Sequence, residues 1–288
     1  LASCRVAAMP VSRRPLRSPP SSAAAAKAPV SSMASAKVVG LGRPERLAAG
    51  ATTGRPKAAM IARARATWDF FNKYSTKEFI GTKLLATWVH DEGFVSTSSK
   101  PIRTMEDFRG LKIRAASRQS SKLLARLGAT PVGMPIPPVA DAMTKGTIDG
   151  FMTAWEIIPA FKLHEVSKFH TEIEASRPSM FTAGFVMAMN QAKYDSLPAD
   201  LKSVIDKHSG AGLSRTIGRY WDEATAPGRN AALARGNTFN KIDAAETDRW
   251  IQASSPLYDE WVADMDKRGL PGKQMLQDAK DLIKKYNK

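Results

Sequence analysis

All 22 aromatic residues of this 288-residue chain follow position 66, and this distribution limits which part of the chain can build a core. Phe, Trp and Tyr side chains supply a large share of the apolar area that a fold buries. Residues 1–66 consist mainly of Ala, Arg, Ser, Pro and Gly, which bury too little surface to offset the entropy cost of ordering. We therefore expect residues 1–66 to form a disordered or misframed tail.

The tail also holds most of the net charge. Of the formal net charge of +16, residues 1–66 contribute +11 through 12 basic residues and one acid. A basic tail leaves a nucleic-acid or anionic-surface binding protein open as an alternative function. The charges are dispersed and no aromatic side chain in the tail could stack on bases, so we expect no nucleic-acid partner. The acid-poor, Arg-rich and Ser-rich composition also fits an organellar transit peptide.

Motifs that would indicate catalysis or a bound metal are absent from the sequence. The single cysteine, Cys4, excludes an intramolecular disulfide and a thiolate zinc site, and the four histidines form no HxxxH pair. The chain has no GxSxG, GxGxxG or GxxxxGK[ST] motif. We therefore predict no catalytic residue, no metal and no cofactor. An enzyme on an α/β scaffold stays an alternative, because active-site residues need not be neighbours in sequence.

Strand-like and helical segments alternate after the tail. Strands are expected at 83–90, 111–115, 130–134, 148–153, 169–174, 181–189 and 237–242. Helices are expected at 62–74, 104–108, 117–127, 138–145, 198–234, 244–268 and 272–286, with one more that ends at 168 and a turn at 96–100. The apolar run 181–189 is typical of a fully buried strand. This alternation predicts an α/β fold with crossover helices.

Arg114 is the residue whose position most favours a binding role. It lies at the end of the expected strand 111–115, which runs directly into a helix that begins near Ser117. Ligands of open α/β sheets bind outside the carboxyl ends of strands, and a helix start favours an anion. An arginine there can hold a carboxylate through two parallel hydrogen bonds. From spacing alone, a surface arginine or a pair with a local acid is the more frequent role of such a residue.

Three ordered blocks of the chain resemble a known family. They are KPIRTMEDFRGLKIRAASRQSSKLLARLGATPVGMP (100–135), GTIDGFMTAWEIIPAFKLHEVSKFHTE (146–172) and FVMAMNQAKYDSLPADLKSVIDKHSG (185–210). Together they resemble the solute-binding subunits of TRAP transporters, the dicarboxylate-binding-protein family. The resemblance covers about 67–288, whereas residues 1–66 do not match.

The resemblance implies a two-lobed, periplasmic-binding-protein-like α/β fold with mixed sheets and a long connecting helix. Residues 67–91 and 180–220 would form the first lobe, and residues 92–179 and 221–288 the second lobe, which carries the carboxylate-binding arginine. Nothing in the tail matches the strand–helix–strand unit with which the family's first lobe begins, so we expect an incomplete first lobe.

The resemblance also implies a function. Members of the family are periplasmic proteins that capture a small organic acid between their lobes and deliver it to the membrane permease subunits of the transporter. They are not enzymes and need no cofactor. For this chain we therefore expect a small organic acid as ligand and a TRAP permease as partner.

Arg114 matches the arginine that makes the ion pair with the ligand's carboxylate in this family. The block Thr153, Ala154 and Trp155 matches positions that line the cleft, and Trp155 would be a wall for an apolar or aromatic ligand body. Ordinary core packing is an equally good explanation for a tryptophan. Ile136 lies in a further cleft segment, where sialic-acid-binding members have a phenylalanine.

Two more positions complete the set of candidate binding residues. Phe94 stands where sialic-acid-binding members carry a second arginine, so we expect a simpler monocarboxylate, keto acid or hydroxy acid as ligand. Asn190 ends an expected strand directly before a helix, where capping of that helix is favoured over contact with a ligand.

Overall fold

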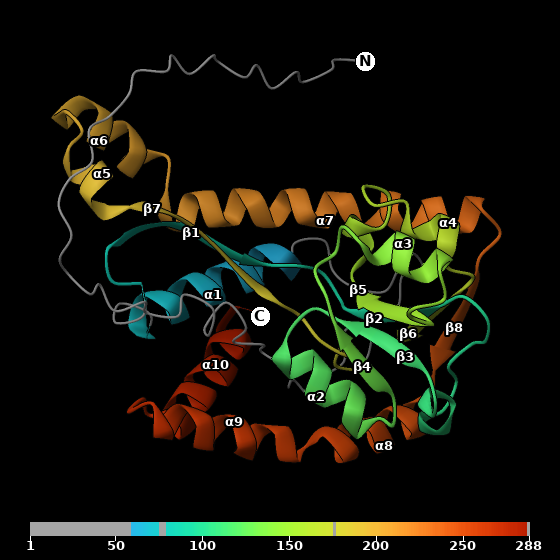
Figure 1. The fold of residues 1–288 in the computed structure, drawn as a ribbon. Helices are drawn as coiled ribbons and strands as arrows, with labels where there is room; N and C mark the ends of the chain where they lie inside the picture. Colours follow the sequence, from blue (N-terminus) through green and yellow to red (C-terminus); the bar gives the residue numbers. More distant parts are fainter. Residues whose placement is uncertain (1–58, 75–78, 175–176, 287–288) are drawn as a thin grey trace, which may run out of the picture. The chain divides into compact units, whose positions relative to one another are not determined.

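The structure is a computed structural model that describes residues 59–74, 79–174 and 177–286 (Figure 1). The expectation of a disordered tail concerns residues that mostly lie outside this part. Helix α1 (Ala59–Tyr74) nevertheless begins inside the expected tail, and Met60 and Ala64 are fully buried. Their spacing of four residues places both on one helix face, which packs against another helix without needing an aromatic side chain.

A mixed six-stranded sheet forms the larger part of the described fold. Its strands, in spatial order, are β4 (Thr130–Gly133), β3 (Lys112–Ala115), β5 (Gly150–Thr153), β2 (Phe94–Thr97), β6 (Phe169–Ile173) and β8 (Thr238–Ile242). β3 is parallel to both β4 and β5, β2 is antiparallel to β5 and β6, and β6 is parallel to β8. The predicted mixed α/β fold is thereby confirmed. β2 was not predicted, because its polar residues Ser96 and Thr97 fall in the turn expected at 96–100.

The second sheet has two described strands, β1 (Thr82–Val89) and β7 (Gly184–Asn190), which pair antiparallel. The prediction of a fully buried strand at 181–189 is wrong, since no residue of β7 is buried and Met187 is 41% exposed. Within the described residues β7 pairs only with β1, so part of its apolar surface faces outward. Apolar composition alone therefore does not establish burial at both faces of a strand.

Helices surround the strands. They are α2 (Arg118–Arg126), α3 (Val139–Thr144), α4 (Leu163–Val166), α5 (Gln191–Asp195), α6 (Ala199–Lys207), α7 (Gly210–Ala234), α8 (Ala244–Ser254), α9 (Pro256–Lys267) and α10 (Gly272–Tyr286), with the short 3-10 helices η2 (Met105–Phe108) and η3 (Trp155–Ile157). Two long predicted helices are each divided in two. α6 ends at Lys207 and α7 begins at Gly210, which has a φ of 77°. α8 ends at Ser254, and α9 begins at Pro256 after a single intervening residue.

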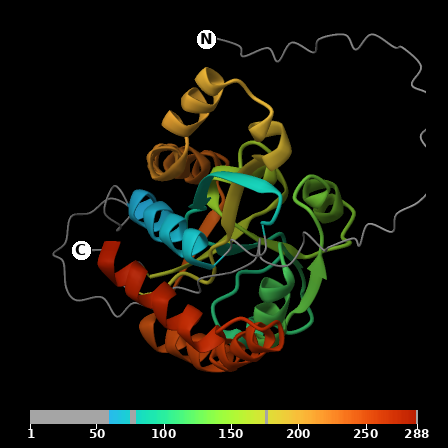
Figure 2. The same cartoon turned by 90° about the vertical axis from the view of Figure 1, so that its left-hand side faces the viewer.

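The two faces of the six-stranded sheet bury different apolar clusters. Val95 and Met152 belong to a cluster with Leu124 of α2 and Trp250 of α8. The neighbouring strand residues Phe94 and Phe151 point to the opposite face and pack in a second cluster with helices α3, α4 and α7. Helix α7 and the pair α8–α9 accordingly lie on opposite sides of the strands (Figures 1 and 2).

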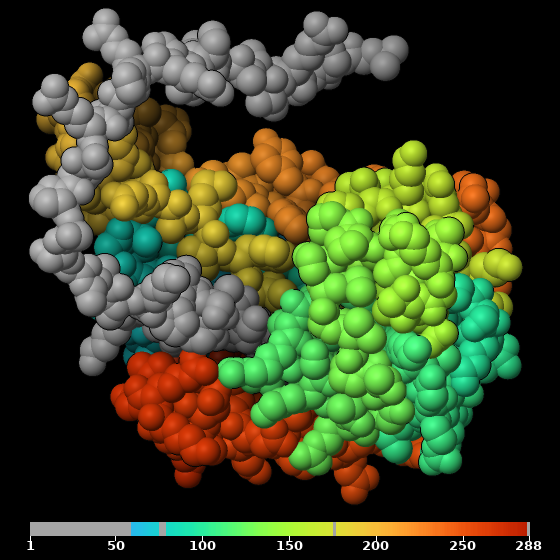
Figure 3. Space-filling view, in the orientation of Figure 1, coloured from blue at the N-terminus to red at the C-terminus, as the bar shows by residue number. Residues whose placement is uncertain are grey.

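Charged pairs join α2 to the C-terminal helices. Lys122 and Arg126 both donate to Glu260 of α9, at 2.5 and 2.7 Å, and Arg118 donates to Asp264. The green surface of α2 and the red surface of α9 meet there in Figure 3. Helix α10 packs on α1 instead, where Phe70 and Phe71 surround Met275.

The long helix α7 contacts both sheets. Near its start, the Ser214 hydroxyl accepts a hydrogen bond from the backbone N–H of Thr87 in β1 at 3.0 Å. Near its end, Gly228 lies against the backbone of Trp155 and Ala232 is buried in the second cluster. This agrees with the prediction of a long connecting helix.

A buried carboxyl group in η3 lies near the loop that joins β1 of one sheet to β2 of the other. Glu156 of η3 has two buried oxygens that make no hydrogen bond within the described part of the chain. Burial, with a smaller contribution from the charge of Asp91 in the loop between β1 and β2, raises the pKa of Glu156 to about 8. Asp91 itself accepts a hydrogen bond from Thr225 of α7 and lies 3.8 Å from Arg63 of α1. At neutral pH Glu156 is therefore mostly protonated and uncharged.

Replacing Gly228 by alanine should destabilise the fold. A Cβ atom there would lie 1.9 Å from the carbonyl oxygen of Trp155, so α7 or η3 would have to shift, at a cost of about 1–3 kcal/mol. Gly212→Ala on the same helix is the control, because a Cβ atom at that position meets nothing within 4 Å and alanine favours helix. Urea denaturation of both variants measures the difference, and equal stability would contradict the close contact.

Glu156→Gln should change how stability depends on pH. The pKa of Glu156 rises from 4.5 to about 8 on folding, so between these values the folded protein keeps a proton that the unfolded chain releases. The free energy of unfolding should then fall as pH rises through this window, by up to about 1.4 kcal/mol per pH unit, and the glutamine variant should lack this part of the slope. Urea denaturation of both proteins between pH 5 and 8 is the measurement, and parallel curves would refute the assignment.

Candidate functional site

Arg114 occupies the third position of β3, between two parallel neighbours. It lies opposite Val132 of β4 and Phe151 of β5. Its side chain is buried, with the residue only 5% exposed, and is held by two backbone carbonyls. Nε donates to the oxygen of Met134 at 2.9 Å, and Nη1 donates to that of Met152 at 3.0 Å.

The helix that follows β3 begins where the sequence indicated. Ser117 has extended backbone geometry, and its hydroxyl accepts a hydrogen bond from the backbone N–H of Ser120, which makes it the N-cap of α2. Arg114 thus lies just before the N-terminus of α2.

No carboxylate among the described residues neutralises Arg114. Burial alone lowers the pKa of its guanidinium to about 10, so the group stays charged at pH 7. Arg114 is therefore neither the surface arginine nor the local ion pair that spacing alone favours. A buried cation without a counter-ion is energetically costly, and an anion bound beside it would offset that cost.

The strand register places Arg114 and an aromatic pair on one face of the sheet. Side chains of paired strand residues point the same way, and alternate residues share a face. Arg114 pairs with Phe151, and Thr153 lies two residues further along β5 and pairs with Phe94. All four side chains therefore share the face that carries the second cluster, in which Phe94 and Trp155 are buried.

Trp155 is fixed between two other rings. The centroids of Phe94 and Trp155 are 3.9 Å apart at an interplanar angle of 18°, and Trp155 also stacks on Phe239 of β8 at 5.4 Å. Ala154, which precedes Trp155 as the N-cap residue of η3, is 1% exposed. Ile136 is partly buried and packs at the edge of the same cluster.

Asn190 is the one predicted site residue that the structure leaves apart from the others. It pairs with Thr82 at the end of β7 beside α5, away from the six-stranded sheet (Figure 1). Its side-chain oxygen accepts a hydrogen bond from the backbone N–H of Lys193 at 2.9 Å. Asn190 therefore caps α5, the role that its position before a helix favoured.

Sequence reasoning missed the polar residues that surround Trp155. Glu172 of β6 accepts a hydrogen bond from the indole Nε1 at 3.0 Å, and Arg229 of α7 donates to both oxygens of Glu172. His170, on the same face of β6, contacts Ser96 and is fully buried. Burial lowers the pKa of His170 to about 4, so its ring is neutral at pH 7. The available signal was that His170 and Glu172 share one face of a predicted strand.

The described residues contain no group of three or more His, Cys, Asp or Glu side chains arranged to hold a metal ion. Among the described helices, none combines the length and the apolar character needed to cross a bilayer.

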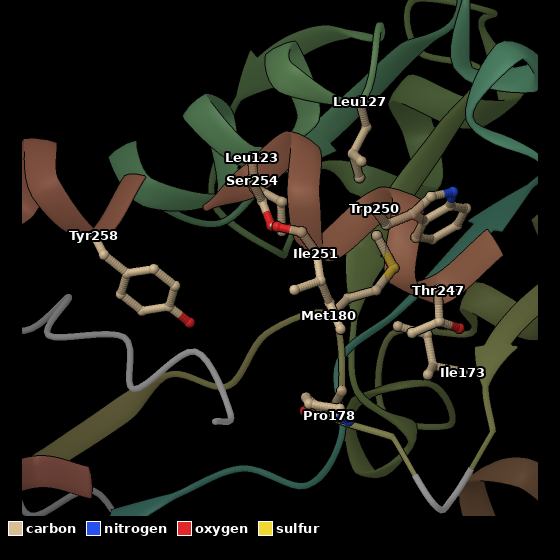
Figure 4. Close-up of a pocket in the computed structure, with 11 residues that line it drawn as sticks. Leu123, Leu127, Ile173, Pro178, Met180, Thr247, Trp250, Ile251, Ser254 and Tyr258 are labelled. Atoms are coloured by element: carbon tan, nitrogen blue, oxygen red, sulfur yellow. The ribbon is translucent and has the colours of Figure 1, made fainter. Parts of the chain in front are cut away.

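An apolar pocket lies on the opposite face of the sheet from Arg114. Leu123, Leu127, Met180 and Trp250 line it between α2, α8 and the segment before β7 (Figure 4). These four residues all belong to the first apolar cluster, and no predicted site residue lies in the pocket. None of the residues that line this pocket is charged. The face of the sheet that carries Arg114 is therefore the better candidate site for an anion.

The chain is similar to solved TRAP solute-binding proteins. One, from Rhodoferax ferrireducens in complex with copurified benzoate, is 42% identical with a TM-score of 0.77, and the match covers 79% of this chain and 71% of that chain. Another, a marine metagenome protein specific for aromatic acid ligands, is 38% identical with a TM-score of 0.77 over 80% of this chain and 72% of that chain.

Curated relatives match over shorter stretches. A solute-binding protein of Albidiferax ferrireducens is 32% identical over 42% of this chain and 36% of its own length. The C4-dicarboxylate-binding periplasmic protein DctP of Rhodobacter capsulatus is 28% identical over 65% of this chain and 54% of its own length. The chain thus spans between about a third and a little over half of the length of these relatives.

A family model also matches most of the chain, over residues 66–264. The match begins at the end of the expected tail and agrees with the resemblance seen in the sequence. The chain belongs to family 7 of the bacterial extracellular solute-binding proteins, the DctP family.

Proposed function

We propose that this protein captures a small carboxylic acid with an aromatic or apolar body for a TRAP-type transporter. The observation that carries the proposal is a buried, charged Arg114 that no described carboxylate neutralises, on the same sheet face as the Phe94–Trp155 stack. A carboxylate supplies the missing negative charge, and an aromatic ring fits beside stacked aromatic side chains.

Arg114 is already oriented for this role. Its Nε and Nη1 groups each donate to a backbone carbonyl, which fixes the plane of the guanidinium. The Nη2 group makes no hydrogen bond within the described part of the chain and is left to donate to a ligand. A guanidinium held in this way loses little conformational entropy when it binds, which favours affinity.

The ligand class follows from the surroundings of Arg114. Phe94 stands at the position where sialic-acid-binding members of the family carry a second arginine. Without a second cation there, a ligand with a single carboxylate is the better match. Trp155, Ile136, Thr153 and Ala154 would surround the rest of the ligand. The relatives that are 42% and 38% identical to this chain over their matched parts support this class, since one holds benzoate and the other is specific for aromatic acid ligands.

The remaining parts of the proposal concern the whole protein. Residues 67–91 with 180–220 and residues 92–179 with 221–288 would form two lobes that enclose the ligand and deliver it to membrane permease subunits in the periplasm, without catalysis or a cofactor. The family description as extracellular and the periplasmic relative support this location. Met180 and Phe181 pack in the core of the six-stranded sheet, so the boundary between the lobes would lie after them.

Arg114→Ala in the full-length protein should weaken binding of benzoate by about thirtyfold or more. The variant loses the charged hydrogen bonds and leaves the ligand's carboxylate without its partner, at a cost of about 2–5 kcal/mol. Arg114→Lys should recover only part of the affinity, because an ammonium group lacks the planar pair of donors. Isothermal titration calorimetry measures both, and unchanged affinity in the alanine variant would remove Arg114 from the site.

A panel of acids should separate the ligand classes. Ligands that bind only the folded state raise its melting temperature, so benzoate, 3-hydroxybenzoate and simple keto acids should stabilise the protein. Dicarboxylates such as succinate and sugar acids such as sialic acid should stabilise it less at the same concentration. Thermal unfolding at matched pH and ionic strength is the measurement. Stabilisation by sugars or dicarboxylates alone would show that the ligand class is wrong.

A further inference from the structure

The chain passes between strands of the two described sheets three times. Residues 90–93 lead from β1 to β2, the segment that ends at residue 183 leads from β6 to β7, and α7 leads back from the first sheet towards β8. We call these passages the first, second and third crossing. A change in the angle between the sheets has to bend all three, so contacts among the crossings decide whether they bend together or separately.

His90 connects the first crossing to the second. Its backbone N–H donates to the carbonyl of Ala183 at 3.3 Å, and its carbonyl accepts a hydrogen bond from the Thr182 hydroxyl at 2.8 Å. The ring adds a third bond, because the backbone N–H of Ala183 donates to Nε2 at 3.0 Å. The ring also packs edge-on against Phe181, with centroids 5.0 Å apart. His90 is only 6% exposed, so these bonds lie in a largely water-free environment that strengthens them.

The bond at Nε2 determines where the imidazole of His90 carries its hydrogen. A ring nitrogen that accepts a hydrogen bond has no hydrogen of its own, so the hydrogen of the neutral ring is on Nδ1. Nδ1 in turn donates to its partner, the backbone carbonyl of Asp91. Both nitrogens of the ring therefore take part in holding the first crossing in place.

Gly93 shows how closely the first two crossings approach. Its backbone N–H donates to the carbonyl of Phe181 at 2.9 Å. A Cβ atom at position 93 would lie 2.1 Å from the ring of the same phenylalanine. The two crossings are thus in direct contact at both ends of the segment 90–93.

Asp91, the neighbour of His90, connects the first crossing to the third. Its Oδ2 atom accepts a hydrogen bond from the Thr225 hydroxyl of α7 at 2.8 Å, and Oδ1 lies 3.8 Å from Nη1 of Arg63 in α1. The side chains of Asp91 and Arg63 are each 19% exposed. Glu156 of η3 is close enough for the charge of Asp91 to contribute to its raised pKa, and its neutral form does not repel Asp91 at pH 7.

We infer that His90 and Asp91 form a joint that links the three crossings, so that the angle between the two sheets changes only when all three bend at once. Two adjacent residues of one short loop contact both of the other crossings, and their bonds lie at the same level of the fold. Loss of either residue's contacts would release one crossing from the other two. The inference concerns the protein without a ligand and does not depend on which acid it binds.

A pair of spin labels, one beside each sheet, measures how freely the angle varies. Asn72 of α1, which packs on the first sheet, and Ala125 of α2, which packs on the second, are exposed and can each be replaced by cysteine for labelling. Cys4→Ser removes the natural cysteine from the full chain. Pulsed electron paramagnetic resonance then gives the distribution of distances between the labels, and we expect one narrow distribution for the parent.

Two variants each remove one connection of the joint. His90→Phe keeps an aromatic ring against Phe181 but loses both ring hydrogen bonds, and Asp91→Ala loses the bond from Thr225. Each should broaden the distribution or add a second distance. His208→Phe is the matched control, because His208 is exposed at the end of α6, and it should leave the distribution unchanged.

Conservative variants separate the joint from a general contribution to stability. The side-chain oxygen of His90→Gln can accept from Ala183, and that of Asp91→Asn can accept from Thr225, so both should restore the narrow distribution. A residue that merely stabilises the fold would lower the melting temperature without changing the distances in the folded protein. If His90→Phe does not fold, Asp91→Ala with Asp91→Asn still decides the outcome.

Two results would overturn the inference. One is a parent-like distance distribution in a folded His90→Phe or Asp91→Ala variant, because that crossing would then not depend on the joint. The other is a ¹H–¹⁵N spectrum of the parent that places the ring hydrogen of His90 on Nε2, since Nε2 would then be unable to accept from Ala183.

Discussion

The register of β5 between its two neighbours is the constraint on which the candidate site depends. β5 runs parallel to β3 and antiparallel to β2, so Phe151 pairs with Arg114 on one side and Thr153 pairs with Phe94 on the other. A slip by one residue at either pairing would move a whole strand's side chains to the other face. Arg114 would then face the apolar cluster that contains Leu124 and Trp250, away from the carbonyls of Met134 and Met152 to which it now donates. The charge of Arg114 thus makes the observed register more favourable than registers shifted by one residue.

Local patterns predicted the elements that carry the site, because each of these elements has a local cause. The strand that contains Arg114 was predicted from its short apolar run. The start of the next helix was predicted from the capping serine, Ser117, that follows it closely. The helix of residues 198–234 was predicted without its interruption, since the break between Lys207 and Gly210, where Gly210 has a positive φ, lies in a sequence that otherwise favours helix. β2 was missed for a different reason. It is an inner strand that buries the polar residue Ser96, whose hydroxyl is hydrogen-bonded to His170. His170 lies far away in the sequence, so no local pattern indicates this contact.

The site itself was only partly accessible from the sequence. Arg114 and Thr153 lie on the neighbouring strands β3 and β5, and Ala154 and Trp155 directly follow β5. Resemblance to a family was enough to group them. Glu172, Arg229 and Phe239 join the same cluster from β6, α7 and β8. Their interactions with Trp155 and with one another depend on the packing of α7 across the sheet, which is a property of the whole fold. Sequence patterns report the periodicity of single elements, whereas the crossing of a helix over a sheet depends on side chains from both.

Pro227 gives the long helix a mechanical property that its length alone would not suggest. It lacks an amide hydrogen, so the carbonyl of Glu223 has no partner at the usual place in the helix, and bending there breaks no hydrogen bond. The residues before Pro227 are anchored to α1 and β1, and those after it to η3 and the six-stranded sheet. The position at which α7 bends most easily, Pro227, therefore lies between its two sets of packing contacts, directly before Gly228. Bending of α7 between these two sets of contacts therefore costs least at this single peptide unit.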